Sequence, residues 1–116
     1  LGRDPFAQHG FVNTPVYRGS TVLYPTLASI EVKTQPYTYG RRGTPTVRAL
    51  ESALTSLAGG ADTKLTASGY QAVTTALLAF AQSGDHILMV DTVYQPTRQF
   101  CDHLLKRLGV ETEYYD

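Results

Sequence analysis

The chain has 116 residues, of which 42% are hydrophobic and 17% are charged, and its formal net charge is zero. This composition is sufficient for a packed core and argues against disorder, while the balanced charge argues against a general nucleic-acid or membrane-surface binder. No apolar run is long enough to span a membrane, and the single Cys101 cannot form an internal disulfide, so we expect a protein of a reducing compartment, the cytoplasm.

Residues 1 to 36 lack a clear hydrophobic period, and prolines interrupt them at wide spacing. Because proline blocks regular backbone ladders, only brief extended pieces are expected, at Val12 and over residues 20–24. So long an irregular segment is rare in a compact domain unless it is functional or wraps a partner. We therefore interpret residues 1–43 as an extended N-terminal arm and inter-subunit loop.

The arm ends in an unusual stretch, Tyr37-Thr38-Tyr39-Gly40-Arg41-Arg42-Gly43-Thr44-Pro45-Thr46. Each of its arginines carries a planar, permanently charged guanidinium group that suits phosphate or carboxylate. Its glycines allow turns that other residues resist. Taken alone, the stretch fits an anion-binding loop about as well as it fits a solvated surface loop before a helix.

Helix and strand signals alternate from Thr44 onward. Thr44 is suited to cap a helix, Pro45 to open it and Gly59 to end it, which predicts a helix over residues 45–58. Apolar residues recur on one face of this helix, at Val47, Leu50, Leu54 and Leu57.

The segments that follow are predicted to be a strand at 63–67, a helix at 70–82, a strand at 86–90, a helix at 96–108 and a strand at 110–115. The core side of the last helix is predicted to be Phe100, Leu104, Leu105 and Leu108, with Cys101 facing the core or half-buried. This alternation predicts an α/β fold with a mainly parallel sheet and flanking helices, of which residues 44–116 form the first part.

Two loops leave the carboxyl ends of the predicted strands, where α/β sheets bind ligands. Ser68 and Gly69 directly precede a helix, whose free N–H groups suit a phosphate, but taken alone they favour a simple helix cap, because Ser-Gly before a helix is common. In the second loop, Tyr94 is placed to stack on a flat ligand and move a proton, or to pack beneath the loop.

In combination, these features describe a site for a planar, phosphorylated cofactor. The glycine fingerprints of dinucleotide and ATP sites are absent, which argues against those ligands. The histidines at positions 9, 86 and 103 do not have metal-binding spacing, so no metal is expected.

The sequence resembles the cysteine and methionine metabolism family of pyridoxal-phosphate (PLP) enzymes, which have the aspartate-aminotransferase-like fold type I. The resemblance covers the chain from Gly10-Phe11-Val12-Asn13-Thr14-Pro15 onward and includes residues 37–46, Ser68-Gly69, Gly84-Asp85-His86-Ile87-Leu88 and Thr92-Val93-Tyr94-Gln95-Pro96-Thr97. It implies an extended arm followed by the start of the large PLP-binding domain.

The resemblance also implies roles for individual residues. Tyr39 and Arg41 match residues that reach across a dimer interface to the PLP phosphate of the neighbouring subunit. Gly69 and Tyr70 match the pair whose backbone N–H groups hold the phosphate, although small or aliphatic residues are more frequent at the position of Tyr70. The remaining matches are Tyr94, which would stack on the pyridine ring and assist proton movements, and Arg42, which would meet a distal carboxylate of the substrate.

Within the family, Arg41-Arg42-Gly43-Thr44 and the run 98–102 look more like the bacterial cystathionine β-lyases. These enzymes of methionine biosynthesis cleave a sulfur amino acid, cystathionine, to homocysteine, pyruvate and ammonia. The resemblance therefore implies a carbon–sulfur lyase that forms homodimers with shared active sites, and further a tetramer.

The lysine that forms the Schiff base with PLP is not recognisable here. None of Lys33, Lys64 and Lys106 resembles its site, and we expect it, with the aspartate that pairs with the pyridine nitrogen, beyond Asp116. Both chain ends read as cuts through a longer protein, so the 116 residues alone are expected to be inactive. Two alternatives stay open: a γ-lyase or γ-synthase of the same family, and a non-catalytic α/β binding module.

Overall fold

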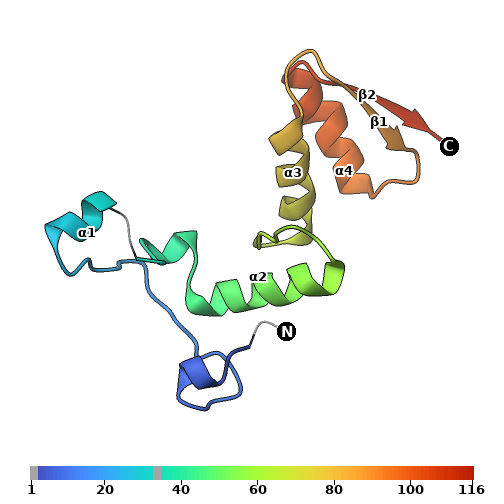
Figure 1. Ribbon diagram of the computed structural model, residues 1–116. Coiled ribbons are helices and arrows are strands. Elements are labelled where there is room, and N and C mark those ends of the chain that lie inside the picture. The colour runs from blue at the N-terminus through green and yellow to red at the C-terminus, as the bar shows by residue number, and fades with distance from the viewer. Residues whose placement is uncertain (1–2, 33–34) are drawn as a thin grey trace. The chain divides into compact units, whose positions relative to one another are not determined.

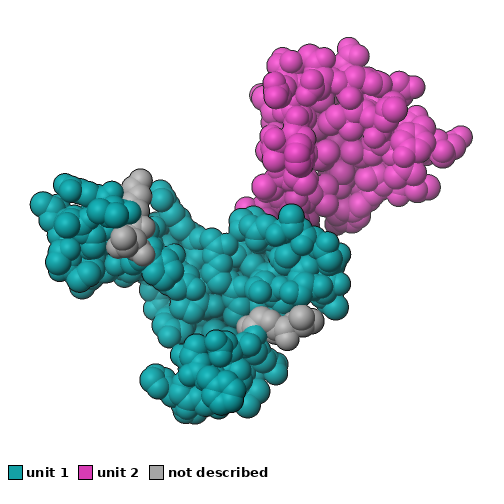
Figure 2. All heavy atoms as spheres, viewed as in Figure 1, with its two compact units in different colours: residues 1–65 teal, residues 66–116 magenta. Residues whose placement is uncertain are grey.

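The computed structural model describes residues 3–32 and 35–116 (Figure 1). Lys33 therefore lies outside the described residues. The chain divides into two compact units, residues 1–65 and residues 66–116 (Figure 2). The helix that begins at Pro45 belongs to the first of these units. The division of the full protein into an arm and a PLP-binding domain at residue 43 stays a prediction.

The first unit contains short helical turns and one long helix. Its elements are the 3-10 turns η1 (Phe6–Gln8) and η2 (Gly40–Arg42) and the α-helices α1 (Leu27–Val32) and α2 (Pro45–Ala58). The helix α1 was not predicted, because it has six residues and buries none of them. Thr26 and Ser29 stabilise its start, since each side chain accepts a hydrogen bond at 3.2 Å from the other's backbone N–H.

The helix α2 has the predicted bounds. The Thr44 side chain accepts a hydrogen bond from the Val47 N–H at 3.3 Å, and Pro45 occupies the first turn, where its missing N–H costs nothing. Gly59 ends the helix in the left-handed region, with φ 65°, and its N–H donates to the Thr55 carbonyl. The local capping signals in the sequence therefore predicted this helix correctly.

The strand predicted at residues 63–67 is absent, and that prediction was wrong. The backbone N–H groups of Thr63, Leu65 and Ala67 bond to side chains instead of to a neighbouring strand. Thr63 donates to the Asp62 carboxylate at 2.8 Å and Ala67 to the Gln71 side chain at 3.0 Å. Local partners thus satisfy the amides that a sheet would otherwise have paired.

The second unit combines helices with a parallel pair of strands. Its elements are α3 (Gly69–Phe80), β1 (His86–Val90), α4 (Gln95–Gln99), the π-helical segment η3 (Phe100–Leu105) and β2 (Glu111–Tyr115). The strands pair in parallel from His86 opposite Glu111 to Val90 opposite Tyr115. This arrangement confirms the predicted α/β class and the parallel sheet.

The core of the second unit lies between the helices and one face of the sheet. Phe100, Cys101, Leu105 and Val110 are buried in it, with Leu77, Ala81, Ile87 and Met89 packed against them. Leu104 and Leu108, predicted to face the core, are 39% and 49% exposed. The buried residues of α4 and η3 are instead Thr97, Phe100, Cys101 and Leu105.

Two features are missing from the part of the chain that the structure describes. No helix in it is both long enough and apolar enough to cross a membrane. It also contains no cluster of three or more His, Cys, Asp or Glu side chains arranged to hold a metal ion. The cytoplasmic location stays a prediction.

Candidate functional site

Tyr39, Arg41 and Arg42 lie together on one turn of the first unit. Tyr39 is extended and forms an antiparallel bridge with Thr21, after which the chain tightens into η2. The Arg41 guanidinium lies 5.9 Å from the centre of the Tyr39 ring, within the range of a cation–π contact. Neither arginine forms an ion pair among residues 3–32 and 35–116, so both charges are available to an anion.

Gly40 fixes the position of this turn. Its N–H donates to the Ser20 carbonyl at 2.7 Å, which places its Cα directly against the neighbouring backbone. A Cβ added at Gly40 would overlap the carbonyl oxygen of Gly19. Only glycine fits this close approach, so the backbone from Gly19 to Thr21 sets the place of the two residues beside Gly40.

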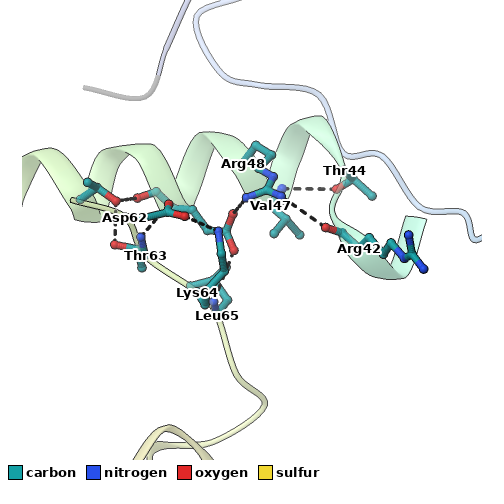
Figure 3. Close-up of polar contacts among 10 residues, drawn as sticks. Arg42, Thr44, Val47, Arg48, Asp62, Thr63, Lys64 and Leu65 are labelled. Carbon is teal, nitrogen blue, oxygen red and sulfur yellow. Dashed lines mark hydrogen bonds and ion pairs between the residues drawn. The ribbon is translucent and has the colours of Figure 1, made fainter. Parts of the chain in front are cut away.

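A polar cluster ties the same turn to α2. Arg48 donates to the Glu51 carboxylate at 2.8 Å and makes a longer contact, 3.5 Å, with the Arg42 carbonyl (Figure 3). Glu51 is only 6% exposed, and its second oxygen accepts from the Leu65 N–H at 3.4 Å. A buried carboxylate is costly unless it is paired, so this cluster contributes to holding η2 against the helix.

Sequence reasoning missed this cluster. The available signal was the spacing of Arg48 and Glu51, three residues apart on a helix, which favours a side-chain pair. Burial of Glu51 could not be read from that spacing, because it depends on the segment that returns past α2 at Leu65.

The start of α3 offers free hydrogen-bond donors. Ser68 caps the helix: its hydroxyl accepts from the Gln71 N–H at 3.1 Å and its carbonyl from the Ala72 N–H at 3.0 Å. The N–H groups of Gly69 and Tyr70 have no acceptor among the described residues. A Cβ at Gly69 would meet no atom within 4 Å, so a ligand can approach the backbone there.

These two donors lie at the N-terminus of a 12-residue helix, where the helix dipole is positive. Paired N–H groups with a positive dipole end and open space beside them fit a phosphate group. The residues present therefore fit the phosphate of the cofactor that the sequence predicts.

The side chain of Tyr70 does not take part in this group of free N–H donors at the start of α3. Its ring packs edge to face against Phe100, with the ring centres 6.3 Å apart and the planes at 89°. Such a geometry is favourable for aromatic pairs. The ring of this larger residue is thus accommodated against the core of the second unit, while its backbone N–H stays free.

Tyr94 begins α4, in the same unit as Gly69 and Tyr70. Its carbonyl accepts hydrogen bonds from the N–H groups of Thr97 and Arg98, at 2.8 and 3.2 Å. Its side chain is 64% exposed. The helices α3 and α4 pack against each other and both begin at the same end of the second unit (Figure 1).

Two other reactive side chains, Cys101 and Lys64, lie in other surroundings. Burial raises the pKa of the Cys101 thiol, and the residue is 1% exposed, which makes it a poor nucleophile. Lys64 pairs with Asp62 on the surface at 2.5 Å. The predicted site residues thus fall into two groups, Tyr39 with its two arginines in the first unit, and the helix starts in the second.

Comparison with known proteins gives a consistent result. The family model described as "Cys/Met metabolism PLP-dependent enzyme" matches residues 1–116. A Rhizobium johnstonii protein named "Putative cystathionine beta-lyase" is 57% identical over 99% of the chain, and the cystathionine beta-lyase of Salmonella typhimurium is 38% identical over 99%. The crystal structure of cystathionine gamma-lyase from Lactobacillus plantarum, complexed with L-serine, superposes with a TM-score of 0.86 at 30% identity over the whole chain.

The chain spans only part of each of these proteins. It covers 29% of the Rhizobium protein, 30% of the Salmonella protein and 28% of the Lactobacillus chain. The match nevertheless extends over both compact units, and it confirms the predicted aspartate-aminotransferase-like fold.

Proposed function

Because the chain belongs to the Cys/Met metabolism family of PLP-dependent enzymes, we propose that the full-length protein is a carbon–sulfur β-lyase acting on cystathionine. It would convert cystathionine and one water to homocysteine, pyruvate and ammonia. PLP, when bound, supplies an electron sink that allows the Cα proton of an amino acid to be removed. The residues of this chain bind and orient the cofactor for that reaction.

The observation that carries the proposal is the pair of free N–H groups at the start of α3. Gly69 and Tyr70 would bind the phosphate of PLP there, with the positive end of the helix dipole behind them. Tyr94 would lie against the pyridine ring from the start of α4, and its phenol oxygen would hold or pass a proton near the reacting carbon.

The first unit would complete the site from a second copy of the chain. Tyr39 and Arg41 would contact the phosphate of the neighbouring subunit, since a guanidinium binds phosphate oxygens in a forked, charge-assisted geometry. Arg42, exposed on the same turn, would bind the distal carboxylate of the substrate. The protein would then act as a homodimer with shared sites, or as a tetramer of two such dimers.

The choice of β-cleavage rests on the relatives. Proteins named as cystathionine beta-lyases are 57% and 38% identical, whereas the gamma-lyase of known structure is 30% identical. That gamma-lyase keeps γ-cleavage as the second candidate, because it superposes on the whole chain with a TM-score of 0.86.

Product analysis separates the two reactions. The full-length enzyme, loaded with PLP and given cystathionine, is expected to release pyruvate in a one-to-one ratio with homocysteine. Release of 2-oxobutyrate with cysteine would overturn β-cleavage in favour of γ-cleavage. A sample stripped of PLP serves as the control and is expected to release neither oxoacid.

A further inference from the structure

The direction of the Tyr94 ring depends on the loop of residues 91–95. The loop connects the end of β1 to the start of α4. The side chain of Tyr94 makes no hydrogen bond among the described residues and is 64% exposed. No hydrogen bond of its own therefore holds the ring, and the backbone of the loop sets the point from which the side chain extends.

Arg98 binds both ends of this loop. Its backbone N–H donates to the Tyr94 carbonyl at 3.2 Å. Its guanidinium donates to the Asp91 carbonyl at 3.0 Å and to the Asp91 carboxylate. Asp91 is in turn fixed to the sheet, because its N–H donates to the Tyr115 carbonyl at 2.7 Å. One residue thus connects the end of β1 to the first turn of α4, through its side chain at Asp91 and through its backbone N–H at Tyr94.

Tyr114 of β2 holds the other side of the guanidinium. Its ring centre lies 3.7 Å from the central carbon of the Arg98 fork, a close cation–π contact. The Tyr114 hydroxyl donates to the Asp102 carboxylate at 2.7 Å. Burial, with a further contribution from Asp102, raises the pKa of Tyr114 to about 12, so the hydroxyl stays a donor at neutral pH.

We propose that Arg98 is a positioning residue for Tyr94, which fixes the 91–95 loop so that the ring is held against the bound cofactor. The inference rests on the proposed function, in which Tyr94 contacts PLP. Arg98 is 26% exposed, and its fork is already used by Asp91 and Tyr114, so it acts through the loop and not on the ligand.

The arrangement requires arginine. A lysine has one compact charge, and it cannot bind a carbonyl and a carboxylate together while lying flat on an aromatic ring. A lysine at position 98 would keep the ion pair with Asp91 and lose the bridge to its carbonyl. The substitution Arg98→Lys therefore separates the effect of charge from the effect of geometry.

The test uses the full-length enzyme with PLP and compares Arg98→Ala, Arg98→Lys, Tyr94→Ala and the double alanine variant. The visible circular dichroism of bound PLP reports how the cofactor is held, and a titration gives its dissociation constant. The exposed Arg107→Ala variant is the matched control. Arg98→Ala is expected to weaken PLP binding about 10- to 100-fold. It is also expected to change the visible band in the same direction as Tyr94→Ala.

Non-additivity is the decisive result. If Arg98 acts through Tyr94, the double variant binds PLP no more weakly than Tyr94→Ala alone, and Arg98→Lys recovers less than half of the loss. Effects of the two alanine variants that add would overturn the inference. The inference would also be overturned if Arg98→Ala kept the wild-type visible band and PLP affinity while Tyr94→Ala changed both. That result would not contradict the proposed function.

Two further outcomes are distinguishable. If Tyr94→Ala itself binds PLP as the wild type does, the proposed role of Tyr94 is wrong and the inference fails with it. If Arg98→Ala does not fold, Arg98→Lys decides: a changed visible band supports the positioning role, and a wild-type band contradicts it.

Discussion

Replacing Arg41 with alanine in the full-length protein is expected to weaken PLP binding by about 10- to 150-fold. A hydrogen bond to a charged group contributes ~1.5–3 kcal/mol, and each 1.4 kcal/mol corresponds to about tenfold in affinity. Arg41 is exposed and forms no ion pair among the described residues, so its removal breaks no ion pair and costs within the chain the cation–π contact with the Tyr39 ring. A PLP titration of the stripped enzyme measures the effect.

The loss should be specific to the cofactor. Thermal unfolding of the PLP-free Arg41→Ala protein is expected to match that of the wild type closely, because Arg41 is exposed and a cation–π contact at an exposed site adds little to stability. Arg107→Ala, which removes an equally exposed arginine from the second unit, should change neither quantity. Equal PLP affinities in Arg41→Ala and the wild type would contradict the phosphate role of Arg41.

Replacing Gly40 with alanine is expected to have a larger effect, because it displaces Tyr39 and Arg41 together. The added Cβ would overlap the Gly19 carbonyl oxygen, and no side-chain rotation relieves the clash, because the position of a Cβ is fixed by its own backbone and the carbonyl is a backbone atom. The bridge between Thr21 and Tyr39 would open. Overpacking of this kind costs ~1–3 kcal/mol in unfolding free energy, and PLP affinity should fall at least as far as in Arg41→Ala.

Gly19→Ala is the matched control for this experiment. It adds the same methyl group on the opposite side of the contact, where no atom lies within 4 Å of the new Cβ. Its unfolding free energy should stay within about 0.5 kcal/mol of the wild type, as measured by urea denaturation. If Gly40→Ala and Gly19→Ala prove equally stable and bind PLP equally, the close approach at Gly40 does not set the position of η2.

The parts of the fold that were predictable depend on neighbours in sequence. The helix α2 is delimited by Thr44, Pro45 and Gly59 through contacts within a few residues. The apolar run at 86–90 likewise predicts β1. The prediction of a strand at 63–67 was wrong, because the side chains of Asp62 and Gln71 accept hydrogen bonds from backbone N–H groups of this segment. Whether an extended segment becomes a strand depends on a pairing partner, which a local pattern does not specify.

In the candidate site too, the features that depend on neighbours in sequence were predictable and those that depend on distant segments were not. The free donors at Gly69 and Tyr70 could be anticipated, because a serine cap before a helix leaves the first N–H groups free. The contacts of Arg98 with Asp91 and Tyr114 could not be anticipated, since only the parallel pairing of β1 and β2 brings these residues together. The close contact of Gly40 with Gly19 likewise depends on a distant chain segment.

We propose that each PLP phosphate is bound by Arg41 of one copy and by the α3 start of another. Gly69→Pro is suited to disable the second half, because proline is tolerated at the first helical position and removes the N–H donor. Ser68 before it already has the extended backbone that precedes proline, with φ −158° and ψ 160°.

Hybrid dimers of an Arg41→Ala chain and a Gly69→Pro chain, purified with two different tags, test the claim by PLP titration. If the sites are shared, one site of each hybrid dimer is unaltered in both halves and the other carries both changes. With shared sites, half of the sites are therefore expected to bind PLP with wild-type affinity. Weakened binding at both sites, with one change in each site and no site of wild-type affinity, would contradict it, because each copy would then supply both halves of its own site.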